Sequence, residues 1–186
     1  MKCYHGTTAE NYQSIIADKN FKEADCTSWN CSEPNTTYVY PVYKIMKSDC
    51  LDTMEEAQER AIGLCFEQAR LTASIQKSLS DCIYVLELDI PTDLLYNDYS
   101  CPNMEDIASE FYNSDIELSD HLTAVYKADY SPLTAFFNVA GLINNDYINL
   151  EKFSNYEISI MEHMNRNNIY LEQEYPEYQK IDCPLI

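Results

Sequence analysis

Glycine is scarce in this sequence: there are three among 186 residues, and Gly6 is the only one among residues 1–62. A Walker loop or a G-x-G-x-x-G turn needs at least two glycines at short spacing, because the backbone there approaches phosphate closely. No stretch of the chain has that spacing. We therefore expect that neither of these nucleotide-binding loops is present.

Long apolar runs are also missing. The chain begins Met-Lys-Cys-Tyr-His, and no stretch approaches the roughly 20 apolar residues that a membrane span requires. The length suits a single domain, so we expect one soluble, cytoplasmic domain over residues 1–186.

The cysteines are too sparse for a disulfide scaffold and are expected to be free thiols. The closest pair, Cys26 and Cys31, lacks the second pair of ligands that a zinc site needs, so we expect no metal there. The eight positions are Cys3, Cys26, Cys31, Cys50, Cys65, Cys82, Cys101 and Cys183.

Basic residues are few: 12 lysines and arginines stand against 31 acidic residues, which gives a formal net charge of −19. Such a charge repels nucleic acid backbones and anionic membranes and attracts basic partners. Two further interpretations remain open at this point. The acidity keeps the protein soluble, or it mimics a nucleic acid.

Apolar periodicity and turn residues predict an α+β fold. Capping pairs three residues apart, Thr7 with Glu10 and Thr53 with Glu56, mark two helix starts. In the second of these helices a buried stripe is predicted at Ala57, Ala61, Leu64, Gln68, Leu71 and Ile75. The predicted helices are 8–17, 54–79, 103–113 and a turn-and-helix region over 132–142.

The predicted strands do not alternate regularly with the helices. They cover residues 2–5, 83–90, 122–128, 156–161 and 169–172, and two more flank Glu33-Pro34-Asn35 within the segment 25–43. Local hairpins of this kind indicate a largely antiparallel sheet.

The stretch Tyr4-His5-Gly6-Thr7-Thr8 lies where the first predicted strand meets the first helix. A glycine there lets a ligand approach the main chain, a helix start leaves backbone N–H groups unpaired, and a histidine ring nitrogen can bind a sugar hydroxyl. A plain turn closed by a capping pair explains the same residues, so both interpretations stay open on this stretch alone.

With two more segments, this stretch resembles the ADP-ribosyltransferases of the His-Tyr-Glu class, which includes diphtheria toxin and the poly(ADP-ribose) polymerases. That family has His-Gly-Thr or His-Gly-Ser at the end of its first strand, a tyrosine on a following strand and a carboxylate on a late strand. The second segment here runs from Trp29 through Ser32 to Tyr38 and Tyr40, and the third is Asn155-Tyr156-Glu157-Ile158-Ser159-Ile160. The resemblance implies a split, mostly antiparallel sheet with flanking helices and NAD as cofactor.

The resemblance also implies roles for individual residues. Glu157, His5 and Tyr38 would be catalytic, and Asn155 would orient the acceptor. Asn155 replaces the Glu or Gln of arginine-modifying relatives, which puts arginine specificity in doubt. The NAD-binding set would be His5, Gly6, Thr7, Trp29, Ser32, Tyr38 and Tyr40.

The chemistry supports one carboxylate and one aromatic ring. Nicotinamide leaves NAD as a neutral molecule, so no general acid is needed, and a carboxylate can stabilise the positive charge that develops on the ribose. On the predicted strand Glu157 would face away from Ile158 and Ile160. Tyr38 or Tyr40 would stack on the pyridinium.

The sequence thus predicts an NAD-dependent mono-ADP-ribosyltransferase that modifies a macromolecule, with a basic protein of host nucleic-acid-binding or defence machinery as target. Phage effectors, including anti-CRISPR proteins, and bacterial toxins of this kind imply the cytoplasm of a bacterial or phage-infected cell. The alternatives are a toxin of an antiphage or toxin–antitoxin system that acts on RNA or DNA and is held by an antitoxin, an NAD glycohydrolase, and a non-enzymatic acidic binder of a basic surface.

Overall fold

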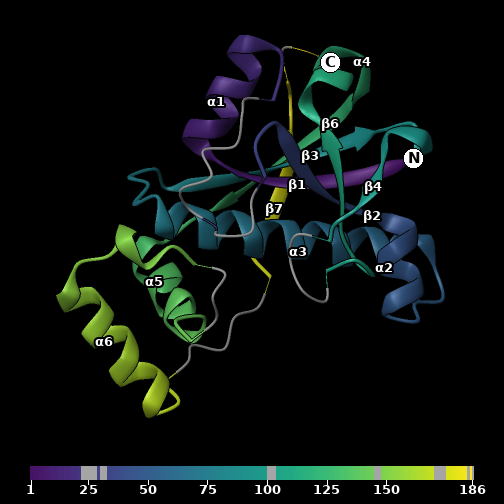
Figure 1. Ribbon diagram of the computed structural model, residues 1–186. Coiled ribbons are helices and arrows are strands. Elements are labelled where there is room, and N and C mark those ends of the chain that lie inside the picture. The colour runs from purple at the N-terminus through teal and green to yellow at the C-terminus, as the bar shows by residue number, and fades with distance from the viewer. Residues whose placement is uncertain are drawn as a thin grey trace.

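A computed structural model describes residues 1–21, 29, 33–99, 104–144, 148–169, 175–183 and 185. Its elements follow the α+β pattern that the sequence predicts (Figure 1). In chain order they are β1 (Lys2–Thr8), α1 (Ala9–Asp18), β2 (Thr36–Pro41), α2 (Val42–Ser48), α3 (Met54–Ile75), β3 (Cys82–Asp89), η1 (Thr92–Leu94), β4 (Tyr96–Asn97), β5 (Ser109–Tyr112), η2 (Asn113–Asp115), α4 (Leu118–His121), β6 (Leu122–Asp129), α5 (Pro132–Gly141), η3 (Leu150–Lys152), α6 (Asn155–Arg166) and β7 (Tyr178–Ile181).

The strands that lie within these ranges form one seven-stranded sheet in the order β4-β5-β2-β1-β3-β6-β7. Every neighbouring pair is antiparallel, which confirms the predicted sheet type. The strands β1 and β3 pair along seven residues, but β1 and β2 pair only at Cys3 with Pro41 and at Tyr4 with Tyr40. The two halves of the sheet are therefore joined by a short ladder in the middle.

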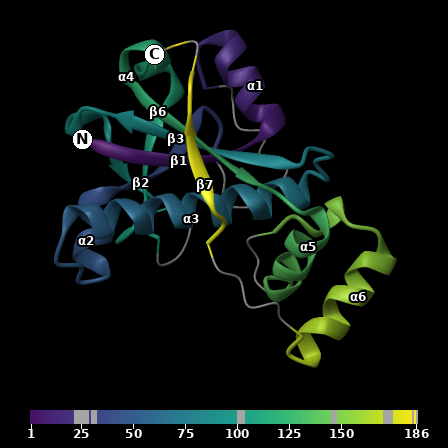
Figure 2. The ribbon, with the colours of Figure 1, turned by 180° about the vertical axis from the view of Figure 1, so that it is seen from behind.

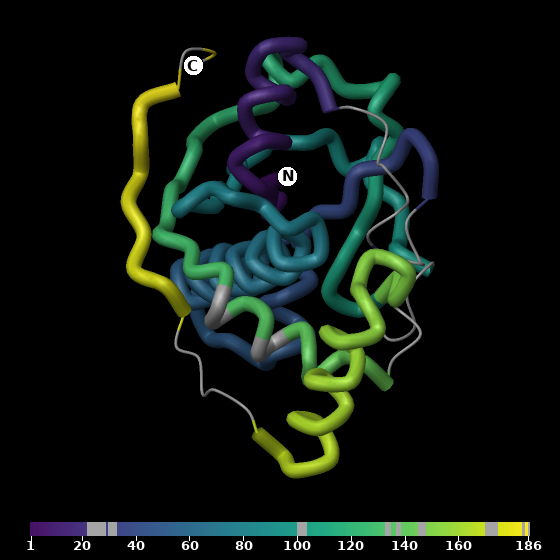
Figure 3. Tube along the Cα trace, turned by 90° about the vertical axis from the view of Figure 1, so that its left-hand side faces the viewer, coloured from purple at the N-terminus to yellow at the C-terminus, as the bar shows by residue number. Residues whose placement is uncertain are grey.

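Helices cover both faces of the sheet (Figures 1 and 3). On one face α2 and α3 pack against Tyr4, Tyr40 and Val85. On the other, Ile15 of α1 and Leu118 of α4 belong to a second apolar cluster with inward-facing residues of β1, β2, β3, β5 and β6. Because both faces are covered, the central strands β1 and β3 are buried for most of their length.

Helix α3 lies very close to β1. The predicted capping box is confirmed, because Thr53 accepts a hydrogen bond from the Glu56 amide and the Glu56 side chain accepts one from the Thr53 amide. The helix ends at Ile75, four residues earlier than predicted, and Lys77 follows in the left-handed region (φ 55°). The predicted stripe is right at Ala57, Ala61 and Ile75, but its remaining three members are only partly buried, whereas the fully buried ones include Cys65, Phe66, Ala69 and Ala73.

Gly6 is needed for this close packing rather than for a turn. A Cβ atom built at Gly6 would lie 1.9 Å from the carbonyl oxygen of Cys65, which is backbone and has no rotamer that moves it away. The strand also continues through Gly6 to Thr8, so the predicted strand end at His5 is wrong. Small residues along α3 and a glycine on β1 thus allow helix and strand to meet.

Helices α5 and α6 pack on one another beside the end of α3 and form a third apolar cluster, which includes Ile75, Val139 and Met161 (Figure 2). Strand β7 pairs with β6 at the edge of the sheet and is the yellow strand in Figure 2. The sequence interpretation misses both β7 and α2. The described part of the chain contains no helix with the length and apolarity of a membrane span.

Two predicted elements have the wrong type. Residues 103–113 were expected to be a helix, but β5 occupies 109–112, because these residues form ladders with β2 and β4. Residues 156–161 were expected to be a strand, but they lie in helix α6. The strands predicted at 83–90 and 122–128 are confirmed, as is the helix at 132–142.

Parts of three other predictions lie outside the described residues. They are the first strand of the predicted hairpin before Glu33, most of the strand at 169–172, and the pair Cys26 and Cys31. Five cysteines are described, and all are free: Cys3, Cys50, Cys65, Cys82 and Cys183.

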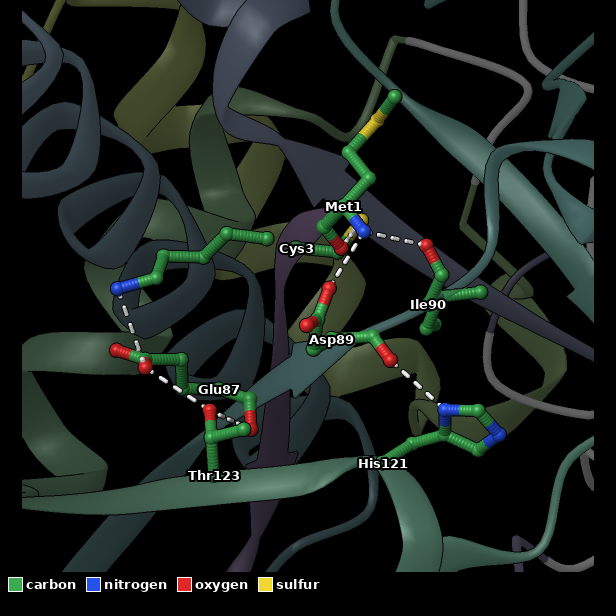
Figure 4. Close-up of polar contacts among 8 residues, drawn as sticks. Met1, Cys3, Glu87, Asp89, Ile90, His121 and Thr123 are labelled. Atoms are coloured by element: carbon green, nitrogen blue, oxygen red, sulfur yellow. Dashed lines mark hydrogen bonds and ion pairs between the residues drawn. The ribbon is translucent and has the colours of Figure 1, made fainter.

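Polar contacts fix the beginning of β1 against β3 (Figure 4). The Met1 amine donates to the Asp89 carboxylate and to the Ile90 carbonyl oxygen, and His121 Nδ1 donates to the Asp89 carbonyl oxygen at 2.7 Å. Two residues earlier on β3, the buried carboxylate of Glu87 accepts a hydrogen bond from the Thr123 hydroxyl at 2.9 Å. The contacts of Met1 fix the start of β1 against β3, and those of His121 and Thr123 hold β3 against α4 and β6.

Candidate active site

The segment that contains His5 is a strand running directly into a helix. The cap of α1 is Thr8, one residue later than predicted, and its hydroxyl accepts from the Asn11 amide at 3.2 Å. Glu10 does not complete a capping box, because its carboxylate accepts from the Ser78 hydroxyl at 2.8 Å and 2.9 Å. Thr7 is buried within β1.

His5 stands where the ladder between β1 and β2 ends. Its Nδ1 lies 2.8 Å from the carbonyl oxygen of Tyr38, and its ring contacts Phe21 edge-on with centroids 5.4 Å apart. Burial lowers the pKa of His5 below its ordinary value of 6.5, and the hydrogen bond to Tyr38 only partly opposes this shift. Because a carbonyl oxygen can only accept, the neutral ring carries its proton on Nδ1, which leaves Nε2 as an acceptor.

The two candidate tyrosines of β2 have different environments. Tyr40 is in the core under α3, where burial raises the pKa of its hydroxyl. Tyr38 is only partly buried, and its hydroxyl accepts from the Glu33 amide at 2.9 Å. Tyr38 is therefore the better placed of the two for contact with a ligand.

Glu157 does not stand on a strand, so its predicted catalytic position loses its structural basis. It is the third residue of α6, in a capping box in which Ser154 accepts from the Glu157 amide and the Glu157 carboxylate accepts from the Ser154 amide at 2.7 Å. The carboxylate also pairs with Lys77 at 3.2 Å. These hydrogen bonds, first those from Ser154 and then that from Lys77, lower its pKa. Asn155, the predicted acceptor-orienting residue, is the first residue of the same helix.

A different carboxylate lies beside Tyr38. Glu110 of β5 is directly opposite Tyr38 in the ladder between β2 and β5, and directly opposite Tyr96 in the ladder between β5 and β4. Residues opposite one another in an antiparallel pair project from the same face with Cβ atoms about 5 Å apart. Tyr38 and Glu110 thus share one face of the sheet. His5 bonds to the backbone carbonyl of Tyr38, but its side chain is on the opposite face, where it contacts Phe21 of the second apolar cluster.

Glu110 is held in an unfavourable environment for a charge. Its Oε2 atom is buried and has no hydrogen-bond partner among the described residues. Burial, and then the negative charges of Asp98 and Glu33, raise its pKa above the ordinary value of 4.5. A carboxylate in such surroundings is typical of a site where a ligand supplies the missing donor.

Lys44 of α2 holds β4 and the backbone that precedes Glu110. Its buried ammonium group donates to Asn97 Oδ1 at 2.9 Å and to the Glu105 carbonyl oxygen at 2.8 Å, and also to the carbonyl oxygen of Ala108. Burial lowers the pKa of Lys44, while the nearby charge of Asp98 opposes that shift. Lys44 therefore ties β4 and the turn before β5 to α2.

The other predicted NAD-binding residues are spread more widely. Trp29 donates from Nε1 to the Thr72 hydroxyl at 3.1 Å and packs against the third apolar cluster beside α3. Ser32 lies outside the described residues. Of the predicted set, the structure brings His5 and Tyr38 into contact and places Tyr40 and Thr7 in the interior.

The sequence contains a signal for Glu110 that was misinterpreted. In Ala108-Ser109-Glu110-Phe111-Tyr112, buried Phe111 is flanked by two residues that face the other way, which is the alternation of a strand.

The described residues contain no cluster of side chains suited to a metal ion.

Taken together, one face of the sheet offers a partly buried aromatic ring on Tyr38 and a carboxylate oxygen of Glu110 that has no partner in the described part of the chain, and His5 offers a hydrogen-bond acceptor on the other face. Such a set suits a ligand with hydroxyl donors and a flat cationic ring. Comparisons with protein-family models, with curated proteins and with solved structures found no match to this chain.

Proposed function

We propose that this protein is an NAD-dependent mono-ADP-ribosyltransferase and that Glu110, rather than Glu157, is its catalytic carboxylate. The observation that carries the proposal is the pair of Tyr38 on β2 and Glu110 on β5, which are directly opposite each other, beside the strand that carries His5. The His-Tyr-Glu resemblance requires a histidine on the first strand, a tyrosine on the next and a carboxylate on a later one. Glu110 would supply the third member, directly opposite the second in the ladder between β2 and β5.

Each of the three residues would have a task. The ring of Tyr38 would stack on the nicotinamide, and His5 would hold the backbone of Tyr38 in place from the other face of the sheet. The Oε2 atom of Glu110, which has no partner among the residues that the structure describes, would accept from a ribose hydroxyl, and its negative charge would stabilise the positive charge that develops on the ribose as nicotinamide departs.

The sheet supports the same proposal. The resemblance implies a split antiparallel sheet, and here the described residues join β1 to β2 through a ladder of two residue pairs. Beyond Tyr4 the side chain of His5, not its backbone, bonds to β2. A site at the split would place the substrate where backbone pairing between β1 and β2 ends.

The charge favours a protein as acceptor. A formal net charge of −19 opposes approach of an RNA or DNA backbone and favours a basic protein surface, such as that of a nucleic-acid-binding complex. Modification of such a surface would block its contact with nucleic acid.

The test is transfer of label from NAD carrying a radioactive adenylate group to a bacterial lysate. We expect labelled macromolecules that disappear after protease treatment and persist after nuclease treatment, and no labelling by Glu110→Gln. Label removed by nuclease would instead indicate an enzyme acting on RNA or DNA. Nicotinamide release without labelled product would indicate an NAD glycohydrolase, and neither product would leave the acidic-binder interpretation.

A further inference from the structure

Three tyrosines gather at the edge of the sheet next to Glu110. Tyr96 of β4, Tyr99 after it and Tyr112 at the end of β5 expose 45%, 76% and 46% of their surface. The rings of Tyr96 and Tyr112 are in contact, with centroids 5.5 Å apart and planes at 56°. We call the pair of Tyr96 and Tyr112 the tyrosine platform.

The register places this platform on the same side of the sheet as the proposed catalytic carboxylate. Tyr96 is directly opposite Glu110, and Tyr112 is two residues further along the same strand as Glu110. Side chains directly opposite or two residues apart on a strand share one face. A group resting on the platform would therefore be a neighbour of the Glu110 carboxylate.

The electrostatics around the platform select the kind of group that can rest there. Glu33 and Asp98 lie close enough to Glu110 for their negative charges to oppose its ionisation. Two exposed aromatic faces beside these carboxylates favour a flat cation over an anion. A nucleotide would bring its phosphates into the same negative field.

We propose that the tyrosine platform binds the acceptor of the transfer reaction and that this acceptor is the guanidinium group of an arginine side chain on a protein. The inference rests on the proposed function, since it assigns the acceptor side of the same site. Asn155, which in the resemblance put arginine specificity in doubt, is the first residue of α6 and does not belong to this site. A guanidinium is planar and always charged, and it stacks on aromatic rings while its N–H groups pair with carboxylates. A lysine ammonium lacks the planar shape, and a nucleobase lacks the charge.

The chemistry balances with the groups at hand. The bond between C1′ of the ribose and the nicotinamide nitrogen breaks, and nicotinamide leaves with the bonding electron pair as a neutral molecule. A guanidinium nitrogen forms a new bond to C1′ and releases one proton, which Glu110 accepts and passes to solvent. The product guanidinium keeps its single positive charge.

The experiment compares a peptide that contains one arginine with the same peptide in which lysine replaces it, using NAD as donor. Nicotinamide release and peptide labelling are measured separately. We expect labelling of the arginine peptide alone. The double variant Tyr96→Ala/Tyr112→Ala should raise the KM for this peptide roughly fivefold to thirtyfold, as the loss of two cation–π contacts implies.

Two controls sharpen the result. The double variant with phenylalanine at both positions keeps both rings and should keep most of the peptide affinity. Tyr156→Ala removes a tyrosine that is 76% exposed on α6, outside the site, and should leave the KM for the peptide unchanged.

Labelling of the lysine peptide, or labelling confined to nucleic acid, would overturn the assignment of a guanidinium acceptor while the proposed transferase function stands. An unchanged KM in the alanine double variant would overturn the platform. The absence of nicotinamide release with every acceptor would instead remove the proposed function itself, and the acceptor assignment with it.

Discussion

Replacing Glu110 by glutamine should make the protein more stable and inactive at the same time. The carboxylate has a buried oxygen without a partner among the described residues, and Asp98 and Glu33 add to the cost of its charge. Glutamine keeps the shape of the side chain and removes that charge. A residue that a fold retains at a cost in stability is typical of a functional site.

The size of the effect follows from burial and screening. An unpaired buried polar group costs about 1–3 kcal/mol, and more when it is charged. Glu110 is partly exposed, so solvent screening reduces its share, and we expect Glu110→Gln to raise the unfolding free energy by about 1 kcal/mol at pH 7. For a protein of this length that corresponds to a rise in Tm of about 2–4 °C.

The pH dependence of stability gives the sign of the Glu110→Gln effect independently. The pKa of Glu110 is raised in the folded protein, so the native state holds this proton more tightly than the unfolded chain does. Its destabilising effect therefore appears as the pH rises above the ordinary value of 4.5 and is absent at lower pH. The stability gained in Glu110→Gln should be present at pH 7 and vanish near pH 4.

Thermal and urea unfolding at both pH values provide the assay, with Glu177→Gln as a control for removal of an exposed carboxylate. A loss of stability at pH 7, or a gain of equal size at pH 4 and pH 7, would refute the description of Glu110 as an unpaired buried carboxylate.

Three further predictions concern other parts of the fold. Gly6→Ala should lower the unfolding free energy by about 3 kcal/mol in urea titrations, because its Cβ would meet the carbonyl of Cys65; a neutral effect would contradict the close contact between α3 and β1. Lys44→Met should cost about 2–3 kcal/mol by the same assay, because it leaves buried oxygens without their charged donor, and Lys44→Arg should recover part of it; equal losses in both would argue against a role for the charge. Glu157→Ala should cost about 0.5–1 kcal/mol in thermal unfolding through the lost helix cap and its exposed pair with Lys77, with NAD turnover intact.

The helix at 155–166 shows how a short pattern can mislead. Tyr156, Ile158 and Ile160 alternate with polar residues, as they would on a half-buried strand. The buried residues are instead Met161 and Met164, three apart as on a helix, and Ser154 with Glu157 is a capping box of the kind that was correctly read at Thr53. The capping box at Ser154 and Glu157 predicts this helix better than the six-residue alternation of apolar and polar residues predicts a strand.

The alternation around Glu110 is too short to predict strand β5 by itself, because pairing with β2 and β4 is what makes it a strand. Four residues give little periodicity, and the acidic segment before them reads equally well as the surface of a helix. Phe111 is fully buried against the cluster that contains Phe21, and the ladders to β2 and β4 satisfy its backbone. These partners are distant in sequence, so only the folded sheet shows that Glu110 lies beside Tyr38.

The parts of the site that could be predicted are those with local signals. The sequence His5-Gly6-Thr7 stands out because glycine is rare here, and Tyr38 lies in a clear β-branched and aromatic run. Even there the reason for the glycine was wrong, since Gly6 accommodates the Cys65 carbonyl rather than a turn. Contacts between an early strand and a later helix leave no trace in local periodicity.

The most direct test of the account is the rate of nicotinamide release from NAD by the purified protein and by two isosteric variants, Glu110→Gln and Glu157→Gln. One variant alters the carboxylate opposite Tyr38, and the other alters a carboxylate that caps α6. We predict that the unaltered protein and Glu157→Gln release nicotinamide at similar rates and that Glu110→Gln loses at least about a hundredfold, as removal of a charge-stabilising group implies. Full activity in Glu110→Gln, or loss confined to Glu157→Gln, would contradict the assignment.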